Sequence, residues 1–123
     1  MLRAFLFVGI GGFAGSMARY GVSLLVQKAY SQPFPLATFI INIVGCFVIG
    51  LLYGVAQKNS TIGGDMWLIA ATGFCGGFTT FSAFALENNI LFSKQQNGVA
   101  LAYTIASVMI GILLCRWGVK LAS

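Results

Sequence analysis

Charged side chains are scarce in this sequence. Of its 123 residues, 7% are Asp, Glu, Lys or Arg, whereas 59% are hydrophobic. Soluble domains carry about 25% charged residues, so this chain has too few of them to cover a surface that faces water. A membrane span needs about 20 apolar residues, and four spans fill the chain with only short loops left over. The composition therefore predicts an all-α integral membrane protein.

Histidine is absent, and Asp65 and Glu87 are the only carboxylates. Paired-carboxylate, histidine-based and His/Cys metal mechanisms lack their parts, so we do not expect an enzyme. The basic residues are scattered singly, and a nucleic-acid partner would need a clustered basic face. The three cysteines, Cys46, Cys75 and Cys115, lie inside apolar runs, which indicates buried packing residues without disulfides.

Hydropathy and chain breakers predict four membrane helices, at about residues 4–26, 36–56, 66–92 and 98–118. They form a single transmembrane domain over residues 1–123. The start Met1-Leu2-Arg3 looks like the beginning of a signal peptide, but the apolar run that follows is longer than a signal peptide allows. We therefore interpret it as the first membrane helix.

Glycine is abundant, with 16 residues, and much of it lies inside the predicted spans. Small residues four apart let two helices approach closely. This spacing indicates either a specific dimer contact or general helix packing, and it occurs in the pairs Gly11/Gly15, Gly50/Gly54 and Gly73/Gly77.

Residues 72–84 of the third predicted span, T-G-F-C-G-G-F-T-T-F-S-A-F, are unusual for a membrane helix. A glycine inside a helix costs roughly 0.5–1 kcal/mol relative to alanine, and here three lie close together. Broken helices at the bilayer midplane occur where they line an ion or substrate site. We predict a break near the midplane; the alternative is a continuous helix that is merely rich in glycine.

Aromatic and polar groups in the spans are candidate anion ligands. Phe81 and Phe84 are three residues apart and share a helix face; they are either packing residues or rings whose electropositive edges face an anion. Four side chains at membrane depth can donate hydrogen bonds to an anion or to neighbouring helices: Thr38, Asn42, Tyr103 and Ser107.

Two charged residues also fall inside the predicted spans. Arg19 lies in the first span, where a charge is a functional candidate by default, although its long side chain could instead reach the interface. Glu87 lies near the end of the third span. We assign Glu87 a structural role, with Arg19 or the edge of a loop as its partner.

Three stretches together resemble one family along essentially the whole chain. They are G-G-F-A-G at 11–15 followed by Arg19-Tyr20, residues 38–45 with Asn42, and G-F-C-G-G-F-T-T-F-S-A-F at 73–84. In these stretches the chain resembles the Fluc (CrcB-type) fluoride channels, which implies passive, fluoride-selective export across a bacterial plasma (inner) membrane. The resemblance also implies an antiparallel dual-topology homodimer in membrane lipid, with two pores and a central structural sodium ion.

The resemblance further implies a role for individual residues. Phe81 and Phe84 would be the pore phenylalanines and Asn42 the polar group of the pore, with Thr38, Tyr103 and Ser107 along the same path. Arg19 would lie near the aqueous vestibule. The sodium ligands would be the main-chain carbonyls of Gly76 and Thr79.

Two other functions are alternatives to the channel. A small multidrug-resistance-type, proton-coupled cation exporter would also have four helices, but it needs a carboxylate in the first helix, where this chain has Arg19 and no acid. A non-transporting accessory protein would not need Asn42, a broken third helix and Arg19 together.

The distribution of positive charge favours insertion in both orientations. With four spans, one face carries Arg3, Lys58, Arg116 and Lys120, and the other carries Lys28 and Lys94 with Arg19 close by. Orientation follows such counts in short loops, and this bias is weak. We therefore expect both orientations to arise from one gene and to pair as an antiparallel dimer.

Overall fold

The computed structural model describes residues 1–123, apart from the side chain of Thr61. In this described part the chain is helical, and four segments are long and apolar enough to cross a membrane: Leu2–Ala29, Leu36–Lys58, Asp65–Ser93 and Asn97–Ala122. Each lies within a few residues of the range expected from hydropathy. The prediction of an all-α protein with four membrane-spanning helices is confirmed.

The four segments differ in regularity. Three are single α-helices: α1 (Leu2–Ala29), α2 (Leu36–Lys58) and α6 (Asn97–Ala122). The third segment follows a 3₁₀ turn at Ser60–Ile62 and consists of α3 (Asp65–Trp67), a π-helix (Leu68–Cys75), α4 (Gly76–Phe78) and α5 (Phe81–Ser93). Neither the π-helix nor its extent was predicted. A π-helix has wider turns than an α-helix and occurs often at functional sites.

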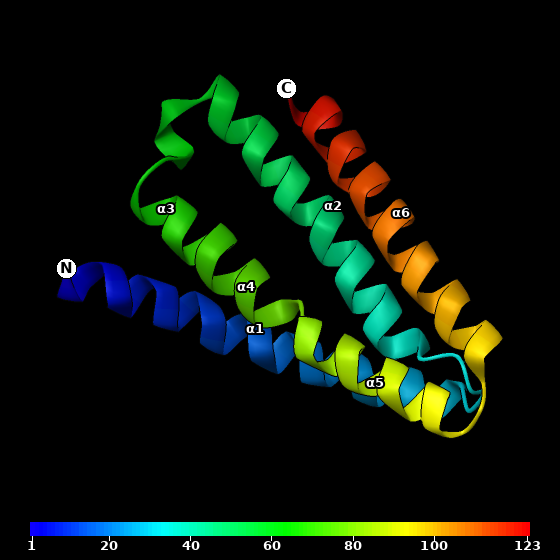
Figure 1. Ribbon diagram of the computed structural model, residues 1–123. Helices are drawn as coiled ribbons and strands as arrows, with labels where there is room; N and C mark the ends of the chain where they lie inside the picture. Colours follow the sequence, from blue (N-terminus) through cyan, green and yellow to red (C-terminus); the bar gives the residue numbers. More distant parts are fainter.

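The helices pair into two arms (Figure 1). In the first arm, α1 runs along the π-helix and α4; in the second arm, α2 runs along α6. The arms converge where the α1–α2 loop and the α5–α6 turn lie, and they spread apart toward the two chain ends. Helices that follow each other in the sequence are thus not the main packing partners.

Glycines bring the backbones of each arm into direct contact. In the first arm, a Cβ on Gly11 would overlap the carbonyl of Ile69, and one on Gly15 would overlap the carbonyl of Phe74. In the second arm, a Cβ on Gly50 would overlap the carbonyl of Cys115. The glycine spacing therefore serves general packing within one chain, and its interpretation as a dimer contact is wrong for these positions.

A small core closes the convergent end. Tyr103 and Ala100 of α6 are fully buried against Leu91 of α5. The partly buried side chains around them come from the α1–α2 loop and from α2, α5 and α6: Phe34, Phe39, Phe84 and Val99. This core holds α5 against α6 although the arms diverge farther along. The three cysteines are free, and Cys75 is buried.

The close approach of α1 to the π-helix can be tested with two glycines of α1. Gly11→Ala should lower the stability of the purified protein in detergent, because overpacking a tight contact costs about 1–3 kcal/mol. Gly9→Ala is the matched control, since nothing lies within 4 Å of a Cβ at that position, and alanine should be neutral or stabilising in the helix. Thermal unfolding measures both, and equal midpoints would contradict the packing described here.

Candidate functional site

The helix of the third segment is interrupted at two threonines. Thr79 (φ −82°, ψ 158°) and Thr80 (φ −150°, ψ 118°) have extended backbones between α4 and α5. The amide and the hydroxyl of Thr79 both donate to the carbonyl of Cys75, at 3.0 and 2.9 Å. The Thr80 hydroxyl accepts from the Ala83 amide at 3.1 Å and so caps α5, as threonine commonly does at a helix start.

Side chains from the two neighbouring helices satisfy the polar groups of this interruption. The Asn42 side chain of α2 donates to the Thr80 carbonyl at 3.1 Å and accepts from the Thr80 amide at 2.9 Å. Arg19 of α1 donates through Nε to the Gly77 carbonyl at 3.0 Å. Hydrocarbon offers no partners to such groups, so these contacts are what allow the helix to be interrupted within a span.

Two carbonyls at the interruption lose their usual helical donors. In a continuous α-helix the Thr80 amide would bond the Gly76 carbonyl, and the Ala83 amide would bond the Thr79 carbonyl. Here the Thr80 amide donates to Asn42, and the Ala83 amide donates to the Thr80 hydroxyl. The carbonyls of Gly76 and Thr79 therefore lack the amide donors that they would have in a continuous helix.

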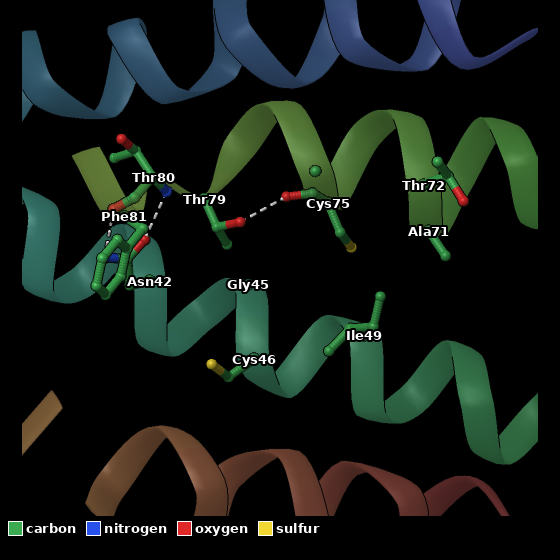
Figure 2. A pocket seen from close by; sticks show the side chains of 11 residues that line it. Asn42, Gly45, Cys46, Ile49, Ala71, Thr72, Cys75, Thr79, Thr80 and Phe81 are labelled. Carbon is green, nitrogen blue, oxygen red and sulfur yellow. Dashed lines mark hydrogen bonds between the residues drawn. The ribbon is translucent and has the colours of Figure 1, made fainter. Parts of the chain in front are cut away.

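A pocket of about 410 Å³ lies between the two arms beside the interruption (Figure 2). Asn42, Gly45 and Cys46 line it from α2, and Gly76 and Thr79 line it from the third segment. A Cβ on Gly45 would overlap the Thr79 methyl group, so this glycine lets α2 approach the interruption. The other lining residues are Ile49, Ala71, Thr72, Cys75, Thr80 and Phe81.

An aromatic row leads from this pocket toward the convergent end. Phe81 lines the pocket and is 78% exposed. Its ring lies 5.6 Å from the ring of Phe84, which lies 4.9 Å from the buried ring of Tyr103. The two phenylalanines therefore share a face, as their spacing indicates, and they connect the pocket with α6.

The Glu87 carboxylate lies at the Tyr103 end of the aromatic row and accepts hydrogen bonds from two hydroxyl groups. Thr38 donates to Glu87 Oε2 at 2.7 Å, and Tyr103 donates to Glu87 Oε1 at 2.8 Å. Thr38 and Tyr103 are themselves buried. The expectation that Arg19 pairs with Glu87 is wrong, because Arg19 instead bonds the Gly77 carbonyl. The alternative expectation, a place at the edge of a loop, agrees with the α1–α2 loop residues that surround Glu87.

Ser107 differs from the other predicted polar residues. Its Oγ is buried and has no hydrogen-bond partner within the described part of the chain. Ser107 lies one turn from Tyr103 on α6, so the two hydroxyls share a face of that helix. A buried hydroxyl without a partner costs free energy, so Ser107 carries a hydrogen for which the described part of the chain offers no acceptor.

The structure thus arranges the predicted residues in two groups. Asn42, Phe81, Gly76 and Thr79 border the pocket, whereas Thr38, Tyr103 and Glu87 form a hydrogen-bonded cluster, and Phe84 joins the two groups. Sequence reasoning missed the main chain of Thr80 as the partner of Asn42. A threonine just before an apolar helical stretch is a helix-start signal that could have placed the end of the interruption.

Comparison with known proteins gives matches over nearly the whole chain. The family model described as CrcB-like protein, Camphor Resistance (CrcB), matches residues 6–119. The chain is 44% identical to a fluoride-specific ion channel FluC of Methylobacillus flagellatus over 93% of this chain and 90% of that one. It is 47% identical to one of Chlorobium phaeobacteroides (91% and 86% covered) and 36% identical to one of Flavobacterium psychrophilum (98% of both).

The role of Asn42 at the interruption predicts a strong effect on stability. Asn42→Ala should lower the unfolding temperature, because it leaves the amide and the carbonyl of Thr80 unpaired, and each buried unpaired group costs about 1–3 kcal/mol. Asn89→Ala, at an exposed position of α5, is the control and should change little. Thermal unfolding in detergent compares the two, and a wild-type midpoint for Asn42→Ala would show that Asn42 does not support the interruption.

Proposed function

The chain belongs to the CrcB-like protein family, and we propose that it is a fluoride-selective channel through which cytoplasmic fluoride leaves the cell down its electrochemical gradient. The observation that carries this proposal is the similarity of almost the entire chain to proteins named fluoride-specific ion channel FluC. With its four membrane-spanning helices, it is a multi-pass bacterial membrane protein. Its function is transport and not catalysis.

Passive transport agrees with the groups that the chain offers. The sequence has no G-x-x-x-x-G-K-[ST] nucleotide motif. A proton-coupled cation exporter would need an acid in α1, where the intramembrane charge is Arg19, and the Arg19 guanidinium bonds a main-chain carbonyl. A channel is sufficient to lower fluoride toxicity, because fluoride that enters as neutral HF ionises in the less acidic cytoplasm and leaves as the ion.

The conduction path in this proposal follows the two groups of residues described above. Fluoride passes the electropositive ring edges of Phe81 and Phe84. Asn42 keeps one amide hydrogen for the ion, since its side chain uses the other for Thr80. The hydroxyls of Thr38, Tyr103 and Ser107 continue the path along α2 and α6, and Arg19 lies near the vestibule that joins the path to water.

A structural sodium ion fits the interruption of the third segment. Hard cations take oxygen ligands, and the carbonyls of Gly76 and Thr79 are deprived of their helical donors by Asn42 and by the Thr80 hydroxyl. Two oxygens from one chain are too few for such an ion, so a second copy has to supply the rest. When bound, sodium would add positive charge beside the pocket and tie two chains together.

An antiparallel, dual-topology homodimer provides that second copy. The pocket beside the interruption opens between the arms, and Phe81 and Gly76 are exposed there in a single chain. Both chain ends and the α2–α3 connection lie toward the spread ends of the arms. The basic residues are divided four against two or three between the two faces, which is a weak bias. A two-fold axis in the membrane plane would bring two interruptions together near the midplane and form two pores.

Fluoride efflux from liposomes tests the function. Vesicles that contain the purified protein should release fluoride when a potassium ionophore balances charge, and they should retain chloride under the same gradient. A fluoride-selective electrode measures the release. Dissipating a proton gradient should leave the rate unchanged while the fluoride gradient persists, and release that stops at that point would contradict passive transport.

The same assay examines the two phenylalanines. Phe81→Ile and Phe84→Ile keep apolar bulk but remove the ring edge, so at least one should reduce efflux severely while the protein still assembles. Phe92→Ile, on an exposed part of α5, is the matched control. Wild-type efflux in both pore variants would make these rings packing residues.

The orientation of the chain in the membrane can be measured with one added thiol. In a protein whose three cysteines are replaced by serine, Asn97→Cys places a thiol at the exposed start of α6. An impermeant maleimide should label about half of the molecules from each side of native membrane vesicles, because each dimer contains both orientations. Labelling from one side alone would contradict dual topology.

A further inference from the structure

A second pocket reaches Glu87 from the convergent end of the molecule. Its volume is about 390 Å³, and it lies apart from the pocket between the arms. The α1–α2 loop lines one side with Gln32 and Pro33, and the end of α5 lines the other side with Lys94. A smaller pocket of about 180 Å³ is also lined by Glu87, together with Gln32 and Pro33. We call the larger of these pockets the mouth.

The Glu87 carboxylate occupies the place where an anion would bind. Its two oxygens accept hydrogen bonds from Thr38 and Tyr103, which come from two different helices. A hydroxyl group has a single hydrogen to donate. While Thr38 and Tyr103 donate to Glu87, neither can donate to a passing anion, and the negative carboxylate also repels that anion.

We propose that Glu87 is a built-in competitor of the transported anion, and that Lys94 receives its carboxylate when the anion displaces it. This inference rests on the proposed fluoride channel. In one state the carboxylate holds the hydroxyls of Thr38 and Tyr103. In the other state fluoride takes both hydroxyls, and the Glu87 carboxylate swings into the mouth to pair with Lys94.

The positions of Glu87 on α5 and of Lys94 directly after its last residue suit this exchange, because the Lys94 amide still bonds the Ile90 carbonyl and continues the last turn. Glu87 and Lys94 are seven residues apart, which is two helical turns, so they lie on the same face and about 10 Å apart along the axis. Glu87 and Lys94 both line the mouth. In the described part of the chain, no other charged residue lines the mouth or the smaller pocket. Among the described residues the ion pair is between Arg3 and Asp65. Lys94 is therefore not paired with another of the described carboxylates and can receive that of Glu87.

The exchange keeps the local charge constant. One negative charge enters the hydroxyl pair as another leaves it, so the buried site never holds two anions and never leaves both hydroxyls without an acceptor. The displaced carboxylate does not remain unpaired either, because the mouth contains Lys94. Lys94 is thus a positioning residue that acts through Glu87, in addition to any general attraction it exerts on anions.

A double-mutant cycle separates these two effects of Lys94. The variants are Lys94→Gln, Glu87→Gln and the double variant, compared by initial fluoride efflux from liposomes at equal protein density. Lys94→Gln alone should slow efflux about five-fold, a size of coupling common between residues of one network. Glu87→Gln should conduct at least as fast as wild type, because its amide offers one acceptor oxygen in place of two. In the Glu87→Gln background, Lys94→Gln should have no further effect.

Lys28→Gln controls for surface charge. Lys28 is an exposed lysine at the end of α1, lies toward the same end of the molecule, and lines neither pocket around Glu87. If lysines act only by attracting anions, Lys28→Gln and Lys94→Gln should slow efflux by similar factors. Each factor should then be the same in the wild-type channel and in the Glu87→Gln channel. That result would overturn the proposal.

Glu87→Asp gives a second, independent test should the glutamine variant fail to assemble. Aspartate keeps the charge but is one methylene shorter, so its carboxylate is drawn back toward α5 and holds the two hydroxyls less well. Replacing Lys94 by glutamine should therefore slow efflux less in the Glu87→Asp background than in the wild type. Slower efflux in a correctly assembled Glu87→Gln or Glu87→Asp channel would make Glu87 a structural anchor and would overturn the proposal. Absence of fluoride efflux from the wild type would instead reject the channel function itself.

Discussion

The paired hydrogen bond between the Asn42 side chain and the Thr80 main chain is the interaction on which the site depends. Main-chain groups in hydrocarbon must find protein partners, and an interrupted helix loses several at once. Asn42 supplies both a donor and an acceptor to one residue, and Arg19 supplies a donor to the carbonyl of Gly77. Because Asn42 belongs to α2 and Thr80 to the third segment, the same pair also connects the two arms beside the pocket.

In this fold the main chain makes the closest helix contacts, and the polar and aromatic side chains form the candidate site. Within each arm, glycines let the main chains touch directly, as Gly11 does at Ile69 and Gly50 at Cys115. This packing uses few side chains. The hydroxyl, amide and aromatic groups are therefore free to lie between the arms and at their convergent end, where Asn42, Phe84 and Tyr103 follow one another from the open pocket to the buried core.

The sequence was informative wherever a local pattern has one physical solution. Long apolar runs between polar loops can form only spans, and a glycine-rich stretch weakens a helix, which is why a break was predicted there. The cap that Thr80 supplies to α5 was not predicted. Partners distant in the sequence could not be deduced in this way. Glu87 could have paired with Arg19 by charge alone, but the fold places it beside Thr38 and Tyr103. The π-helix at Leu68–Cys75 leaves no signal in hydropathy, because every residue in it except Thr72 is apolar or glycine, as in an ordinary membrane helix.

The alternating pairing of the helices has a consequence for biosynthesis. The first arm joins α1 to the third segment, and the second arm joins α2 to α6, so neither arm can close from helices made consecutively. As the chain emerges from the ribosome, α1 and α2 must enter the bilayer before either has met its main neighbour, with glycine-lined surfaces facing lipid. The second arm forms only after the last helix has been translated. Maturation of this protein is thus a late event that involves the whole chain, and a nascent chain that stalls after two helices lacks both arms.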